Sequence, residues 1–353
     1  MSSPDDFLLR PVALTDLTAL ECIAAASVDG ISSLPSDRLQ LQTRIERSMQ
    51  AFASEDAASG EETYLFVLED RRAGRVVGCS GIAASAGFHD RFYSYRNEFV
   101  VHASKALGVS QRMHTLHLCH DLTGCTLLTS FYIEPAYEQG LAPQLLSRAR
   151  LLFIRQHLER FNERIAAESP GLVDAQGQSP FWDAVGRRFF NMDYPQAEAV
   201  IGGRSKAFIA DLMPHSPIHV SLLPENAQFA LGQLHPVGEL PFSILQAEGF
   251  DADSYVDIFD GGPTVEASLH LLRSVRHARE LSLRSGALAL GQAHWHVAAR
   301  RDRAGFRAVL AALPLAALEL PPRHELVQRL ELGEGERITV TPVEPMDGEE
   351  GQP

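Results

Sequence analysis

The segment from Leu127 to Phe153 constrains the fold more than any other part of the sequence. It runs as an apolar strand pattern (LLTSFYIEP), a short turn (AYEQGLAP) and an apolar-striped helix pattern (QLLSRARLLF). A strand that passes through a short turn into a helix brings the helix N-terminal N–H groups to the end of the strand, where they attract an anion. The segment therefore predicts an α/β (α+β) fold with an anion-binding position at the start of this helix.

This strand–turn–helix is similar to the pyrophosphate-binding segment of acyl-CoA N-acyltransferases, whose turn carries an Arg/Gln-x-x-Gly-x-Gly/Ala motif. The turn here reads Glu138-Gln139-Gly140-Leu141-Ala142-Pro143, and we take Gly140 and Ala142 as its candidate cofactor-binding residues. Pro143 has no N–H to donate, and Glu138 places a negative charge where a phosphate would lie. The segment thus favours the acyltransferase fold but predicts a weakened hold on the cofactor.

Composition narrows the class of protein. The chain has 353 residues, which is enough for about two domains, and its net charge of −14 opposes binding to nucleic acid. No apolar run approaches the ~20 residues that a membrane-spanning helix needs, and the acidic start lacks a signal-peptide core. The four cysteines form no CxxC pair, which favours reduced thiols. We expect a cytoplasmic protein with no membrane or nucleic-acid partner.

Strand patterns and helix patterns alternate through the first half of the chain. Thr15 and Ser36 are the expected N-caps of two early helices, the second of which runs through Phe52. A turn at Ala73-Gly74 joins two of the strands into an antiparallel hairpin. The expected strands are Phe7–Arg10, Thr63–Asp70, Arg75–Ser85, Phe99–His102, Leu116–Leu118, Leu127–Ile133 and Arg164–Glu168.

The second half opens with helices and ends in short strand patterns. Ser179 is the expected cap of a helix that has Pro180 at its first position, and Gly249 stops a later helix. A strand at Tyr255–Phe259, a DGGP turn and a linking helix at Leu269–Ala278 follow. We therefore predict an acyltransferase-like domain at residues 1–277, a small β-rich domain at 278–345 and a disordered tail at 346–353.

Several long motifs, in order along the chain, identify a family resemblance from about Phe7 to Ala278. They are SLPSDRLQLQTRIERS, YLFVLED, FYSYRNEFVVHASKALGV, LCHDLTG, SPFWDAVGRRFFNMDY, KAFIADLMPHSPIHV, ALGQLHP and EGFDADSYVDIFDGGPT. Together they resemble the arginine N-succinyltransferase family, and CHDLTG followed by LLTSFY resembles most the alpha-subunit type of its two-subunit arginine/ornithine members.

The resemblance implies a fold, a reaction and partners. The fold would be a GNAT-type acyl-CoA N-acyltransferase core with a small C-terminal β-rich domain. The reaction would transfer succinyl from the co-substrate succinyl-CoA to the α-amino group of L-arginine, with ornithine as a possible second acceptor, in arginine catabolism. No tightly bound cofactor is implied, and a homologous beta subunit is the expected partner.

The resemblance also implies two kinds of site residue. The family's proton donor matches His235 in the motif Gly232-Gln233-Leu234-His235-Pro236, and a succinyl-CoA contact falls on Phe131. Ser130 and Tyr132 flank Phe131, so backbone N–H groups of this strand are candidates to polarise the thioester carbonyl. The alternatives are that His235 only caps a turn and that Phe131 is a core aromatic.

Arginine as a substrate requires carboxylates for its guanidinium, because buried charges must be paired. The candidates are Asp121, Glu168, Asp257 and Asp260, each with an alternative role in a turn or at the surface. For the free carboxylate of succinyl, the candidates are Arg96 and Lys105, with a surface salt bridge as the alternative for Arg96. The run Gly202-Gly203-Arg204-Ser205-Lys206 is either a phosphate clamp or a turn that leads into a helix.

A cluster of imidazoles and thiols invites a zinc site, but its spacing argues against one. His117 and Cys119 would share one face of a strand, while His120 lies on the other. We therefore predict no metal. The cluster consists of His114, His117, Cys119, His120 and Cys125.

Two functional hypotheses follow from these patterns. In the first, the chain is a catalytic subunit of an arginine N-succinyltransferase, with His235 as the acid. In the second, it is a catalytically impaired structural or regulatory subunit, because Glu138 and Pro143 damage the pyrophosphate grip.

Overall fold

A computed structural model describes residues 3–26, 34–201, 207–283, 291–321, 323–333 and 335–344. Within these ranges the strands form one mixed sheet in the order β14-β11-β15-β12-β13-β1-β2-β3-β6-β7-β10-β9-β4-β5-β8. The strands are β1 (Phe7–Pro11), β2 (Thr63–Asp70), β3 (Arg75–Ala83), β4 (Ser94–Ser104), β5 (Val109–Cys119), β6 (Thr126–Ile133), β7 (Arg164–Glu168), β8 (Ile218–His219), β9 (Asp251–Asp257), β10 (Pro263–Ser268), β11 (Arg279–Leu283), β12 (Ala293–Arg300), β13 (Ala308–Pro314), β14 (Glu319–Leu320) and β15 (Arg337–Pro342).

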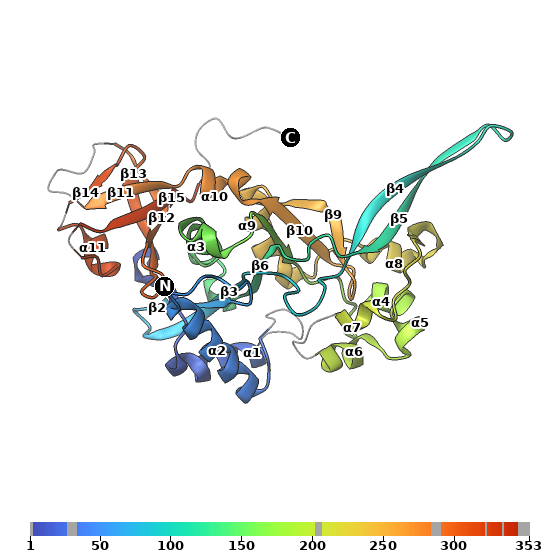
Figure 1. The fold of residues 1–353 in the computed structure, drawn as a ribbon, viewed down its shortest axis with the longest axis horizontal. Coiled ribbons are helices and arrows are strands. Elements are labelled where there is room, and N and C mark those ends of the chain that lie inside the picture. Colours follow the sequence, from blue (N-terminus) through green and yellow to red (C-terminus); the bar gives the residue numbers. More distant parts are fainter. Residues whose placement is uncertain are drawn as a thin grey trace.

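Helices cover the sheet, and one of them lies at the centre of the molecule (Figure 1). The helices are α1 (Leu17–Ala26), α2 (Arg38–Ala53), α3 (Ala142–Gln156), α4 (Pro180–Ala184), α5 (Arg187–Phe190), α6 (Tyr194–Ile201), α7 (Ala207–Ala210), α8 (Glu225–Ala230), α9 (Glu239–Glu248), α10 (Arg273–Arg276) and α11 (Glu325–Arg329). The central helix α3 packs against β3 and β12 as well as α9 and α10, so nearly all of its faces are buried.

Aromatic side chains fill the core beneath α3. Phe153 of α3 packs edge-on against Phe52, Phe66 and Phe306, with ring centroids 5.0 to 5.4 Å apart. Phe306 precedes β13, so this cluster joins the C-terminal strands to the first half of the chain. Because each buried aromatic ring removes a large apolar area from water, the cluster is a major source of stability.

The strands β6 and β7 are parallel neighbours that separate partway along their length. They pair from Thr126 opposite Ile165 to Leu128 opposite Ala167, and β6 then continues to Ile133 without β7 beside it. Ser130 of β6 has φ of +55°, and the pairing of β6 with β3 is irregular at the same place. Such a bulge turns backbone groups away from the ladder, next to the gap between the two strands.

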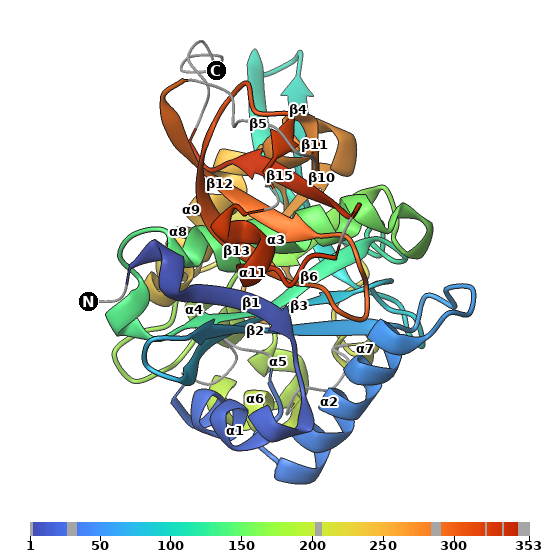
Figure 2. The ribbon, with the colours of Figure 1, turned by 90° about the vertical axis from the view of Figure 1, so that its left-hand side faces the viewer.

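The C-terminal strands continue the sheet, because β13 pairs with β1 at Ala308 opposite Leu9. They also have a core of their own, which includes Leu281, Leu313 and Leu326. Figure 2 shows these strands on one side of β1 and β2, with α1 and α2 on the other side. At the other end of the sheet, β4 and β5 form a long hairpin that projects from the body of the molecule (Figure 1).

Many local predictions are confirmed. Two strands lie where the sequence patterns placed them, β2 (Thr63–Asp70) and β7 (Arg164–Glu168). Ser179 caps α4 by accepting a hydrogen bond from the N–H of Trp182, at 3.2 Å. Gly249 ends α9 in the left-handed conformation, with φ of +102°.

Other local predictions are wrong. Asp37, rather than Ser36, caps α2, because its carboxylate accepts from the N–H of Gln40 at 2.9 Å. Thr15 lies inside a short 3-10 turn before α1 instead of capping it. The strand expected at Tyr255–Phe259 is β9 (Asp251–Asp257), and the expected linking helix is reduced to a 3-10 turn and the short α10.

Two of the predictions concern residues that the structure does not describe. The tail at 346–353 and the run from Gly202 to Lys206 lie outside the described residues. None of the helices in the described ranges is long and apolar enough to cross a membrane.

Candidate functional site

A cavity of about 150 Å³ lies where β6 and β7 separate. Its wall combines β6, the end of β7, the end of β9 with the turn after it, α9 with the residues just before it, and one side chain of α3. The lining residues are Leu127, Leu128, Thr129, Ser130, Phe131, Arg150, Ala167, Glu168, Ser169, Pro170, Val237, Gly238, Pro241, Leu245, Asp257 and Asp260. Five of the predicted site residues are therefore brought together here: Ser130, Phe131, Glu168, Asp257 and Asp260.

Three carboxylates line one part of this wall, and two of them are held by backbone N–H groups. Asp260 accepts from the N–H of Gly171 and from that of Gly262, both at 2.8 Å. Asp257 accepts from the N–H of Phe259 at 2.6 Å. These bonds give both carboxylates hydrogen-bond partners, which they need because Asp257 is only 2% exposed and Asp260 only 8%. Together with Glu168 they form an acidic wall.

Glycine is required where the acidic turn approaches the end of β7. A Cβ on Gly262 would lie 2.4 Å from the carbonyl oxygen of Ser169. Real Cβ atoms do not come that close to a carbonyl oxygen, so the DGGP sequence allows the turn that holds Asp260 to pack directly on β7. This close packing sets the position of the acidic wall.

A guanidinium lies on another part of the cavity wall. Arg150 of α3 is only 2% exposed. Its Nε donates to the carbonyl oxygen of Ser147 at 3.2 Å, its Nη2 to the Ser147 hydroxyl at 3.1 Å and its Nη1 to the carbonyl oxygen of Thr129 at 3.5 Å. Burial lowers the pKa of Arg150 to about 9, which leaves it charged at neutral pH.

Sequence reasoning missed Arg150. The available signal was an arginine inside the apolar stripe QLLSRARLLF. Charged residues are almost never fully buried unless they are paired, so an arginine in such a stripe indicates a specific partner. The neighbouring Arg148 gives the same signal, but its partner is Glu248, at 2.8 Å. Only the structure separates the two arginines.

A second arginine contacts the bulge of β6. Nη2 of Arg44, from α2, donates to the hydroxyl of Ser130 at 2.6 Å. This bond holds Ser130 in its left-handed conformation, which non-glycine residues seldom adopt. The bulge is thus fixed by contacts from α2.

His235 lies beside the cavity rather than in its wall. Its backbone N–H donates to the carbonyl oxygen of Pro170 at 2.9 Å, and the nearby residues Val237 and Gly238 line the cavity. Its Nδ1 accepts from the N–H of Val237 at 3.4 Å, which leaves the ring proton on Nε2. Burial lowers the pKa of His235. The capping role suggested for this residue is therefore observed, next to the cavity.

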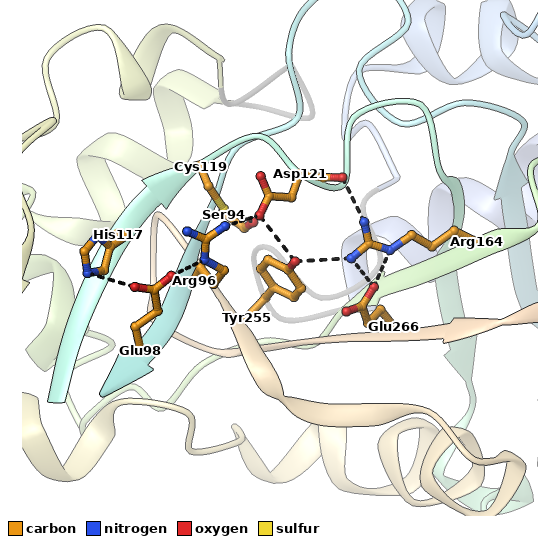
Figure 3. Close-up of polar contacts among 9 residues, drawn as sticks. All are labelled: Ser94, Arg96, Glu98, His117, Cys119, Asp121, Arg164, Tyr255 and Glu266. Atoms are coloured by element: carbon orange, nitrogen blue, oxygen red, sulfur yellow. Dashed lines mark hydrogen bonds and ion pairs between the residues drawn. The ribbon is translucent and has the colours of Figure 1, made fainter. Parts of the chain in front are cut away.

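Arg96 and Asp121 lie together at the base of the β4–β5 hairpin, outside the cavity lining. Figure 3 shows Arg96 between Glu98 and Asp121, with an Nη1 to Asp121 distance of 2.7 Å. The hydroxyl of Tyr255 joins Asp121 to Arg164, which pairs with Glu266. These ion pairs raise the pKa of Arg96. Both candidates belong to a network in which carboxylates and guanidiniums already pair with one another.

The remaining candidates lie elsewhere in the molecule, outside the cavity lining. Tyr132 packs against the apolar cluster beneath α1 and α2. Gly140 forms the turn before α3, with φ of +96°, and Ala142 is buried at the first residue of that helix. Lys105 is exposed in the turn at the end of the β4–β5 hairpin.

The imidazole and thiol cluster has other contacts. His117 lies 3.3 Å from Glu98, and the ring of His114 stacks on Phe99. Among the residues that the structure describes, no group of three or more His, Cys, Asp or Glu side chains is arranged to hold a metal ion.

Comparisons with known proteins agree on one family. The family model described as "Arginine N-succinyltransferase beta subunit" matches residues 7–274. Arginine N-succinyltransferase subunit alpha of Pseudomonas aeruginosa is 44% identical over 337 residues, which cover 95% of this chain and 99% of that protein. Arginine N-succinyltransferase of Escherichia coli is 37% identical over 331 residues, covering 94% and 96%.

A solved structure supports the same assignment. The structure of arginine/ornithine succinyltransferase subunit AI from Pseudomonas aeruginosa aligns with a TM-score of 0.85 and 41% identity, covering 97% of this chain and 100% of that one. The mixed α/β architecture and the resemblance identified from the motifs are thereby confirmed. This chain belongs to the arginine N-succinyltransferase family.

Proposed function

We propose that the chain is an arginine N-succinyltransferase subunit that transfers succinyl from succinyl-CoA to the α-amino group of L-arginine, or of ornithine, in arginine catabolism. The names of its relatives support this reaction and do not favour the impaired-subunit alternative. The observation that carries the proposal is the cavity at the separation of β6 and β7, which has an acidic wall and a buried guanidinium. Such a cavity suits a cationic acceptor and an anionic acyl group at once.

The proposed reaction uses the backbone of β6 and the acidic wall of the cavity. The neutral α-amine attacks the thioester carbonyl carbon, a C–N bond forms, and the resulting oxyanion is stabilised by backbone N–H groups at the bulge around Ser130 and Phe131. The C–S bond then breaks, the amide nitrogen loses a proton, and the sulfur of CoA gains one. The acidic wall of Glu168, Asp257 and Asp260 attracts the cationic side chain of the acceptor.

His235 is the proposed proton donor for the departing sulfur. Its position beside Pro170 and Val237 supports this role, since both of those residues line the cavity. The lowered pKa of His235 means that it is mostly neutral at pH 7. His235 therefore donates its Nε2 proton to the sulfur as Nδ1 takes up the proton that the attacking amine loses, and this uptake requires the bond from the N–H of Val237 to open.

The co-substrate is proposed to lie along β6 toward the start of α3, in a GNAT-type core of residues 1–277, with a β-rich domain at 278–345. Gly140 and Ala142 stand where that arrangement brings the pyrophosphate, but Glu138 is exposed at the same place and Pro143 lacks an N–H. We therefore infer that a homologous beta subunit contributes to binding of succinyl-CoA. The "subunit alpha" in the name of the Pseudomonas relative supports a partner chain.

The test is formation of N2-succinylarginine by the purified chain, alone and with the beta subunit. Transfer that requires both chains is the expected result, and activity of the chain alone would remove the need for the partner. No arginine-dependent transfer in either preparation would overturn the proposed function.

His324 provides a matched control for His235. Its Nδ1 accepts from the N–H of Leu326 at 3.3 Å, the same capping bond that His235 makes with Val237. His324 caps α11 and is not among the residues that line the cavity. We expect His235→Ala to lower kcat at least about tenfold and His324→Ala to leave it nearly unchanged. Equal rates for the two variants would limit His235 to capping.

A further inference from the structure

We propose that Arg150 receives the free carboxylate of the succinyl group and so selects a dicarboxylic acyl group over a simple fatty one. This assignment rests on the proposed function and extends it to a residue that none of the motifs identified. It makes Arg150 a specificity residue for the acyl donor.

The first argument is the contrast between two buried arginines of α3. Arg148 is 3% exposed and is neutralised by Glu248 at 2.8 Å. Arg150 is 2% exposed, and within the described ranges no carboxylate lies within 4.0 Å of its guanidinium. All of its hydrogen-bond acceptors are neutral: two carbonyl oxygens and one hydroxyl. Removing a charge from water without a counter-ion costs several kcal/mol, so the buried Arg150 lowers the stability of the folded protein when no anion is bound.

The second argument is where this cation lies. Arg150 is part of the cavity wall together with the bulged residues of β6, and its guanidinium lies 5.7 Å from the centre of the Phe131 ring. The thioester carbonyl is proposed to meet the same segment of β6. A carboxylate two methylene groups away from that carbonyl is therefore within the same cavity, close to Arg150.

The third argument is the distribution of charge around the cavity. The acidic wall repels a second carboxylate, so within the described lining Arg150 is the position that favours an anion. A guanidinium binds a carboxylate through two parallel hydrogen bonds, which fixes the orientation of the acyl chain. The cationic acceptor and the anionic donor are thereby directed to opposite parts of one cavity.

The experiment compares two acyl donors in the assembled enzyme. Butyryl-CoA has the same number of acyl carbons as succinyl-CoA but carries a methyl group in place of the free carboxylate. For Arg150→Met we expect the ratio of kcat/KM for succinyl-CoA to that for butyryl-CoA to fall by about 10- to 100-fold, and for Arg150→Lys to fall less. A ratio unchanged from the wild type would overturn the assignment.

A second measurement does not depend on turnover. Succinate should raise the melting temperature of the wild-type chain and should not raise that of Arg150→Met. In the absence of ligand, Arg150→Met should be at least as stable as the wild type, whereas Arg148→Met should be less stable, because it removes the guanidinium that lies 2.8 Å from the buried Glu248. Equal stabilisation of wild type and Arg150→Met by succinate would also overturn the assignment.

The outcomes separate this inference from the proposed function. A wild-type assembly that transfers succinyl to arginine, with an unchanged donor ratio in Arg150→Met, refutes the role of Arg150 alone. A wild-type assembly that transfers neither acyl group refutes the proposed function and this role with it.

Discussion

Replacing Glu248 with glutamine should destabilise the protein strongly, since this carboxylate connects three helices in the core. Its side chain is fully buried and lies 2.8 Å from Arg148 of α3 and 3.7 Å from Arg273 of α10. It also accepts from the N–H of Ser274 at 2.7 Å and from the hydroxyl of that residue at 2.8 Å. Glu248→Gln removes the charge and leaves Arg148 buried without a counter-ion.

The expected loss can be compared with that of a surface glutamate that also pairs with two arginines. Removing one partner of a buried ion pair typically costs about 3–5 kcal/mol. Glu280 is 37% exposed and pairs with Arg301 at 3.2 Å and with Arg337 at 3.1 Å, both of them exposed. Exposed pairs contribute up to about 1 kcal/mol each, so Glu280→Gln should change the free energy of unfolding far less.

Urea unfolding measures both variants. Tryptophan fluorescence and far-ultraviolet circular dichroism should give coincident transitions, so that a free energy of unfolding is defined for each variant. We expect Glu248→Gln to be less stable than Glu280→Gln by at least about 2 kcal/mol. A difference below about 1 kcal/mol would refute the argument that Glu248 is a buried counter-ion.

Three further predictions concern pH, backbone packing and thiol reactivity. Burial lowers the pKa of His157 to about 4 in the folded protein. The unfolded chain therefore takes up a proton on this residue at a higher pH than the folded protein does, and the free energy of unfolding decreases as the pH falls from about 6.5 toward 4. That loss is about 2 kcal/mol between pH 7 and pH 5, and His157→Gln should remove it from urea unfolding curves at the two pH values. Gly262→Ala should displace the turn that holds Asp260 and lower kcat/KM at least about tenfold. Gly333→Ala should leave kcat/KM unchanged, because a Cβ at that position would lie 3.5 Å from its nearest neighbouring atom. A thiol reagent should label the exposed Cys22 in the folded protein, while Cys79, whose pKa is raised to about 12 by burial, should react only on unfolding; equal labelling rates would contradict this.

Local patterns predicted individual elements well. The strands β2 and β7, the cap at Ser179 and the stop at Gly249 depend on residues close together in the sequence, and all four are where they were expected. The cap of α2 was misplaced by one residue, because Ser36 and Asp37 are both good capping residues and only the backbone geometry decides between them.

Pairings between distant segments were not predictable from such patterns. The patterns predict the C-terminal strands of the small β-rich domain but not the pairing of β13 with β1, which are roughly 300 residues apart in the chain. The hairpin of β4 and β5 was expected only as two short strands, because its exposed outer half lacks the alternation that marks a half-buried strand. Periodicity reports burial, so an exposed strand gives little signal.

For the candidate site too, individual residues were predictable from the sequence and their arrangement in space was not. Phe131 and Ser130 were named from the family resemblance and its strand, and Glu168, Asp257 and Asp260 from the positive charge of the expected acceptor. The structure brings all five to one cavity. That convergence depends on the separation of β6 and β7 and on a turn more than 80 residues further along the chain. Arg150 was missed because a sequence does not tell a buried arginine with a carboxylate partner, such as Arg148, from one that has no carboxylate partner among the described residues.

Filling the cavity tests the central claim most directly. Val237 is 42% exposed and lines the cavity, whereas Val109 is 45% exposed on β5, outside the lining, so Val109→Trp is a control of matched exposure. Formation of N2-succinylarginine by the assembled enzyme should fall at least about 100-fold in Val237→Trp and stay within about twofold of wild type in Val109→Trp. Equal rates for the two folded variants would contradict the placement of acyl transfer in this cavity.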